Sequence, residues 1–133
     1  MRYEVWAIAL AMLGSQPAYG QDEVGETCSG TETVQLGVDA PKVVPYTLTF
    51  SADLASGYYC YAECRPDQTY AIKDSKSDPI KFADLNAGSQ TRLITFDRKI
   101  SVLKDYQVFT VIYTVRRNAR ATCRPAPFHK PTP

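Results

Sequence analysis

The stretch Gly57-Tyr58-Tyr59-Cys60-Tyr61-Ala62-Glu63-Cys64 holds two of the four cysteines and three of the nine tyrosines. Side chains of an extended strand alternate between its two faces, so Cys60 and Cys64 would share one face, and Tyr59 and Tyr61 the other. The cysteine face can be buried and cross-linked. The two tyrosines form an aromatic surface that either packs into a core or binds a partner, and we favour packing.

Other stretches on both sides of this segment also have strand patterns. Residues 46–51 alternate apolar side chains with threonine and serine, which is typical of a half-buried strand. Residues 106–115 are apolar on both faces and rich in β-branched side chains, which predicts a central strand, and residues 116–120 are expected to form a turn. Shorter strands are expected at 34–38, 69–73, 80–82, 91–96 and 121–124, whereas 100–104 fits a strand end or one helical turn.

Short strands separated by turn residues, without helical periodicity after residue 20, predict an all-β fold. The expected architecture is a small antiparallel β-sandwich, immunoglobulin-like in its arrangement, or a small barrel, stabilised by two disulfides. The residues carry no signature of a particular family.

The chain divides into four segments. Residues 1–20 have the pattern of a cleaved signal peptide, with Arg2, an apolar run over residues 5–13 and small residues before the expected cleavage site. The apolar run is shorter than the ~20 residues that span a bilayer, so no membrane span is expected after cleavage. Residues 21–30 are expected to form an acidic arm, 31–124 a single β domain and 125–133 a mobile proline-rich tail. The protein is expected to be exported, to the periplasm or outside the cell.

An even number of cysteines in a small exported domain predicts two disulfides among Cys28, Cys60, Cys64 and Cys123. In an extended strand, Cys60 and Cys64 would lie ~13 Å apart, whereas a disulfide needs Cα atoms within about 7 Å. This distance argues against Cys60–Cys64. If successive strands run up and down, Cys28 and Cys60 begin their strands at the same end, which favours Cys28–Cys60 with Cys64–Cys123 over the crossed pairing. The alternative, Cys28–Cys123 with Cys60–Cys64, requires the chain to bend after Cys60 and agrees with the opposite charges of the two ends.

Those charges are unevenly distributed, although the net charge is only +1. Five acidic residues precede Lys42 in the mature chain, and five basic residues follow Asp105 with no acid among them: Arg116, Arg117, Arg120, Arg124 and Lys130. We expect the two ends to lie side by side and neutralise each other. The alternative is a basic patch for an acidic partner.

The residues argue against catalysis. His129, the only histidine, lies in the proline-rich tail, where a rigidly placed imidazole is not expected. Ser101-Val102-Leu103-Lys104 matches a serine acyl-transfer pattern but lacks its companion motifs. Cys60 and Cys64 have neither the spacing of a redox pair nor the setting of a zinc site. The sequence therefore predicts no enzymatic activity, no metal and no cofactor.

The remaining functional expectation is binding. The leading hypothesis is an exported soluble interaction or inhibitor-like module of the cell envelope, whose partner is another protein. The alternative is a small-ligand or carbohydrate-binding β domain that uses Tyr59 and Tyr61. A third hypothesis is a small hydrolase without histidine, using acid pairs such as Asp74 and Asp78. Nucleic acid is not expected, because the total charge is close to neutral.

Overall fold

The computed structural model describes residues 22–133, so the expected signal peptide lies outside the described residues. This part of the chain forms antiparallel strands and one short 3-10 helix. Their bounds are β1 Glu23–Leu36, β2 Lys42–Asp53, β3 Tyr58–Tyr61, η1 Pro66–Gln68, β4 Thr69–Ala71, β5 Ile80–Ala87, β6 Gln90–Asp97, β7 Val102–Thr110 and β8 Thr114–Pro125.

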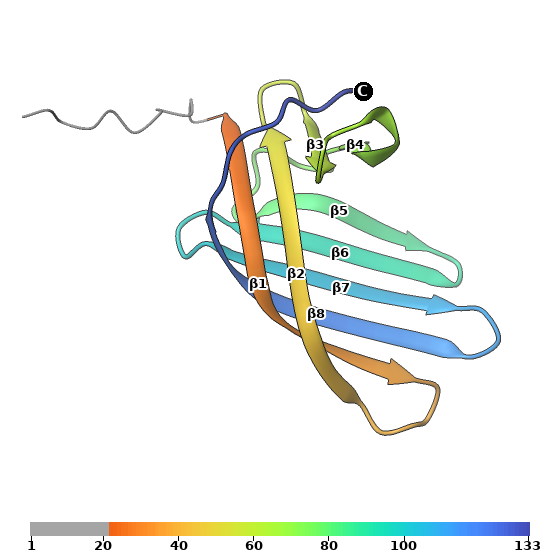
Figure 1. The fold of residues 1–133 in the computed structure, drawn as a ribbon. Coiled ribbons are helices and arrows are strands. Elements are labelled where there is room, and N and C mark those ends of the chain that lie inside the picture. The colour runs from red at the N-terminus through yellow and green to blue at the C-terminus, as the bar shows by residue number, and fades with distance from the viewer. Residues whose placement is uncertain (1–21) are drawn as a thin grey trace, which may run out of the picture.

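The strands form one continuous sheet in the order β4-β3-β2-β1-β8-β7-β6-β5. The sheet curls so that β1 and β2 cross the layer of β5 to β8 (Figure 1). The two edges meet at one point, where Lys73 N–H donates to the Phe82 carbonyl at 3.0 Å and Asp74 pairs with Lys81. The all-β prediction is confirmed, and of the two expected architectures the nearly closed barrel describes the molecule.

The core lies inside the curl, on the inner face of the sheet. Phe50 is at its centre, with its ring centroid 5.1 Å from Phe82 and 5.3 Å from Phe96 in edge-to-face contacts. The remaining buried members are Val24, Cys28, Ala52, Tyr59, Ile80, Ile94, Leu103, Ala121 and Cys123. Seven of the eight strands contribute to this core or pack against it, and the alternation in residues 46–51 is confirmed by buried Phe50 and exposed Thr47 and Thr49.

The expected acidic arm is wrong, because residues 23–30 form the first half of β1. Val24 and Cys28 are buried while Glu23 is exposed, so the strand alternation is present. This alternation is not evident in the sequence, because acidic residues interrupt the apolar positions. β1 is central in the sheet, between β2 and β8.

The expected central strand over 106–115 is also wrong in its bounds. β7 ends at Thr110, and the apolar residues 111–113 form an exposed hairpin turn. The expected turn over 116–120 lies within β8, where Ala119 is buried between exposed Asn118 and Arg120. Apolar side chains at a hairpin end break the usual link between hydrophobicity and burial, which is why the sequence pattern misplaced the turn.

The disulfides are Cys28–Cys123 and Cys60–Cys64, so the favoured pairing is wrong and the alternative is confirmed. Cys28 lies directly opposite Cys123 in the pairing of β1 with β8. The chain bends after β3, with φ of 52° at Ala62 and 60° at Cys64. This bend brings the Cα atoms of Cys60 and Cys64 to 4.9 Å, which an extended strand could not do.

The proline-rich tail, expected to be mobile, packs on the outer surface of the sheet. Ala126 N–H donates to the Gly25 carbonyl at 2.9 Å, and His129 N–H donates to Ser51 Oγ at 2.9 Å. A Cβ atom at Gly25 would lie only 2.5 Å from the Ala126 oxygen, so glycine is needed for this close approach. The tail thereby covers the outer face of β1 and β2.

Candidate functional site

Tyr59 and Tyr61 lie on the inner face of the sheet, opposite Cys60 as expected. Tyr59 is 5% exposed and stacks on Phe82 at 4.9 Å, and Tyr61 is half-buried with its ring 5.5 Å from Tyr59. Burial raises the pKa of both phenols. The pair is therefore part of the interior and does not form a flat exposed aromatic surface.

Tyr59 nevertheless reaches a groove between the edge strands, which we call the β4–β5 groove. It has a volume of about 420 Å³ and is lined by Tyr59, Tyr70, Ala71, Ile72, Lys73, Phe82, Ala83, Asp84 and Leu85. Backbone hydrogen bonds join the two edges where Lys73 meets Phe82, and within residues 22–133 none links β4 itself to β5. Tyr70 is 47% exposed at the groove, and its ring is 5.6 Å from Tyr59.

The backbone along this groove can accept another strand. Among the described residues, β5 pairs with β6 and β4 with β3, so apart from the contacts of Lys73 and Asp74 at the start of β5 each strand has one open edge. A two-residue turn at Gly88 and Ser89 places Ala87 opposite Gln90. In such a hairpin the closing pair exchanges hydrogen bonds, and the alternation directs the N–H and C=O groups of Asp84 and Asn86 to the open edge. Open edges of this kind are templates for strand addition.

A belt of polar side chains crosses the inner face, one from each of five adjacent strands: Tyr46, Glu32, Arg117, Asp105 and Arg92. The Tyr46 hydroxyl donates to Asp105 Oδ2 at 3.0 Å, and Arg92 lies 3.3 Å from the same oxygen. Arg117 donates to both carboxylate oxygens of buried Glu32. Burial, followed by the charge of Asp105, raises the pKa of Tyr46. Each carboxylate is thus held by an arginine, which suits an interior structural network.

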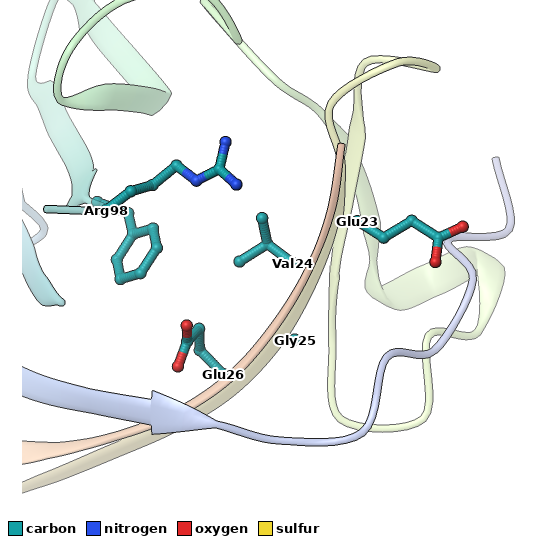
Figure 2. Close-up of a pocket in the computed structure, with 6 residues that line it drawn as sticks. Glu23, Val24, Gly25, Glu26 and Arg98 are labelled. Atoms are coloured by element: carbon teal, nitrogen blue, oxygen red, sulfur yellow. The ribbon is translucent and has the colours of Figure 1, made fainter. Parts of the chain in front are cut away.

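A separate cavity of about 270 Å³ opens near the start of β1, between Glu26 and Arg98. Figure 2 shows Glu26, Val24 and Arg98 directed toward this cavity and Glu23 directed away from it. Burial raises the pKa of Glu26, and the charge of Arg98 opposes the rise. Glu26 Oε2 is buried without a hydrogen-bond partner among the described residues. A single carboxylate of this kind does not form the acid pair that a glycosidase mechanism needs.

The acid pair considered from the sequence, Asp74 and Asp78, has other contacts. Asp74 accepts hydrogen bonds from the backbone of Lys76 and Ser77 at 3.0 and 3.1 Å. Asp78 forms an ion pair with Lys99 at 2.9 Å. Both carboxylates therefore have roles in holding exposed loops.

Apolar side chains are exposed where two hairpins end next to each other. Val38 is 99% exposed, Val111 76% and Ile112 91%. The hairpin ends are joined by a hydrogen bond from Gly37 N–H to the Thr114 carbonyl at 2.8 Å. Exposed apolar groups of this kind are a feature of interaction surfaces, and no sequence pattern separated them from core residues.

Among residues 22–133, no group of three or more potential metal ligands lies together. The same part of the chain holds no helix with the length and apolar character needed to cross a membrane. Comparison with protein-family models, with curated proteins and with solved structures gives no match.

Proposed function

We propose that this protein is an exported binding module that takes an extended segment of a partner protein as an added strand at the β4–β5 groove. One observation carries the proposal. Two open sheet edges border an aromatic groove at the only place where the order of the sheet leaves it unclosed in residues 22–133.

The bound segment would be recognised in two ways. Its backbone would exchange hydrogen bonds with the free groups of Asp84 and Asn86, which gives affinity without dependence on sequence. Its side chains would alternate, so that every second one contacts Tyr70 and Phe82 and the others face solvent. We expect the preferred segments to carry an apolar or aromatic residue at every second position.

The proposed export is supported by the two disulfides, since disulfides persist in oxidising compartments. Cys28–Cys123 joins β1 to β8 in the middle of the sheet. Cys60–Cys64 closes the turn directly after β3, whose Tyr59 lines the groove.

A carbohydrate is the second candidate ligand. The half-exposed ring of Tyr70 lies beside the polar side chains of Lys73 and Asp84, and an aromatic ring with neighbouring polar groups can bind a sugar face. This candidate uses the rings without using the backbone edge, which separates it from strand addition.

The test is selection from a phage-displayed library of random linear peptides on the immobilised domain, residues 21–133. We expect enriched peptides with alternating apolar residues, bound in titration calorimetry by the wild type. The variant Asn86→Pro removes one outward N–H and blocks the edge, while its fixed φ is compatible with an edge strand. It should lose peptide affinity about tenfold or more, given ~1 kcal/mol per backbone hydrogen bond and added steric exclusion.

The matched control is Asn86→Ala, which keeps the N–H and should bind like the wild type. Both variants are first checked for a native urea transition. Equal peptide affinity in Asn86→Pro and the wild type would refute strand addition. Oligosaccharide binding that is lost in Tyr70→Ala but kept in Asn86→Pro would support the second candidate instead.

A further inference from the structure

Strand alternation sorts the charges of β1, β7 and β8 onto opposite faces of the sheet. The carboxylates of Glu26, Glu32 and Asp105 lie on the inner face. Four basic residues of β7 and β8 are exposed on the outer face: Lys104, Arg116, Arg120 and Arg124. Of the expected neutralisation of the two chain ends, the ion pairs among residues 22–133 show one case, Glu32 with Arg117. We call the four outer residues the convex basic stripe.

The stripe is linear. Arg116, Arg120 and Arg124 follow each other at four-residue intervals on one face of β8, so neighbouring Cα atoms lie ~13 Å apart and the row extends over ~26 Å. Lys104 lies directly opposite Arg120 in the pairing of β7 with β8. The row is one strand wide, with Lys104 as a side contact at its middle.

Within the part of the chain that the structure describes, the stripe is not compensated by ion pairs. None of the ion pairs found among residues 22–133 includes any of its four members. Like charges directly opposite each other across a ladder, as in Lys104 and Arg120, destabilise a sheet. The fold therefore keeps an unfavourable arrangement here that an external anion would relieve.

The neighbouring side chains suit an oxyanion. Exposed hydroxyl and amide groups of Ser29, Thr31, Thr33, Asn118 and Thr122 surround the arginines on β1 and β8. Arginine and hydroxyl donors together match the oxygens of sulfate and phosphate groups, which arginine can bind through two parallel hydrogen bonds.

We infer that the convex basic stripe binds a linear anionic polysaccharide through its sulfate or phosphate groups. A row one strand wide on a convex surface follows a chain better than it covers a planar lipid surface. Single-stranded nucleic acid is less well matched, because it is held by exposed aromatic rings as well as charge, and the half-buried Tyr106 is the aromatic side chain of this face of β7. The stripe lies outside the β4–β5 groove, so this inference does not depend on the proposed function.

The test uses a size-defined heparin fragment as the sulfated probe and a phosphorylated dextran of equal length as the phosphate probe. Unmodified dextran is the neutral control. Affinities of residues 21–133 are measured by calorimetry over a series of salt concentrations. We expect binding to at least one charged polymer and none to unmodified dextran. The polymer with the higher affinity identifies whether sulfate or phosphate is the preferred group.

The decisive variant is Arg116→Gln/Arg120→Gln/Arg124→Gln. Its affinity should fall about 30-fold or more at low salt, and the slope of log K against log salt should lose about two to three units. Its urea midpoint should equal or exceed that of the wild type, because the repulsion around Lys104 is relieved. The control Arg65→Gln/Lys76→Gln/Lys99→Gln removes the same charge from exposed loops and should keep wild-type affinity.

Equal loss in the control variant would overturn the inference, because binding would then follow net charge alone. Absence of binding to both charged polymers at low salt would also overturn it. The inference would also be overturned if a single-stranded oligonucleotide of equal charge bound more tightly than the charged polymers. The same holds if the protein bound vesicles with anionic lipid and neither charged polymer. Retention of heparin binding by Asn86→Pro separates this surface from the β4–β5 groove.

Discussion

Removing the Cys28–Cys123 disulfide should destabilise the domain far more than removing Cys60–Cys64. The first bridge joins residues 95 positions apart in the sequence, and the second joins residues four positions apart. A disulfide restricts the unfolded chain by closing a loop, and the restriction grows with the logarithm of loop length.

The loop-entropy relation gives a cost of ~4.7 kcal/mol for losing Cys28–Cys123 and ~1.9 kcal/mol for losing Cys60–Cys64 at 25 °C. Cys28 and Cys60 are both fully buried, so replacing either pair with alanine adds a similar packing loss that largely cancels in the comparison. A small domain has about 5–15 kcal/mol of stability in total, so the first cost is a large fraction of it.

The assay is urea denaturation of residues 21–133 at 25 °C, comparing Cys28→Ala/Cys123→Ala and Cys60→Ala/Cys64→Ala with the oxidised wild type. We expect the two variants to differ by about 3 kcal/mol in free energy of unfolding. If the first variant is unfolded in water, the difference appears as a native transition that only the second retains.

Equal costs would refute this reasoning. With the pairing Cys28–Cys60 and Cys64–Cys123, each double variant would break both bridges, and both would lose the same stability. A small cost for Cys60→Ala/Cys64→Ala together with a large one for the other pair is obtained only with the connectivity of the structure.

Three further predictions concern single residues. Arg117→Met should destabilise the domain by about 1–3 kcal/mol in urea denaturation, because it leaves the buried carboxylate of Glu32 without its donors. Glu26 has a folded-state pKa above its unfolded value, so its contribution to folding stability is present at low pH and is lost as the pH rises through the folded pKa. Glu26→Gln should remove this loss of stability, as measured by urea midpoints between pH 4 and 7. Gly25→Ala should displace the tail and speed chymotryptic cleavage after Phe128, because the new Cβ would lie 2.5 Å from the Ala126 oxygen.

Each of these variants has a matched control. Arg116→Met removes an exposed arginine of the same strand, Glu23→Gln changes a carboxylate directed away from the cavity, and Ser29→Ala alters an exposed position of β1. The first prediction is contradicted if Arg117→Met is as stable as Arg116→Met. The second is contradicted if Glu26→Gln keeps the wild-type pH profile of stability, and the third if Gly25→Ala is cleaved at the wild-type rate.

Local patterns predicted the fold class well and the bounds of its strands unevenly. The clean alternation of residues 46–51 marked β2, because one face meets the core and the other meets solvent. The same rule failed at residues 111–113, which are apolar but exposed, and at residues 23–30, where acidic side chains occupy a central strand. The candidate β4–β5 groove was anticipated only through Tyr59, since its other wall comes from β5.

The sequence by itself determined that this chain forms an all-β domain with two disulfides, because alternation and cysteine number are local properties of the chain. The tertiary structure decided the connectivity, because placing Cys123 opposite Cys28 requires the first and last strands to be neighbours. It also decided which charges meet. Register places Glu26, Glu32 and Arg117 inside the curl and three other arginines outside it. That register is set by pairing between strands that are distant in the sequence, so no local sequence pattern predicts it.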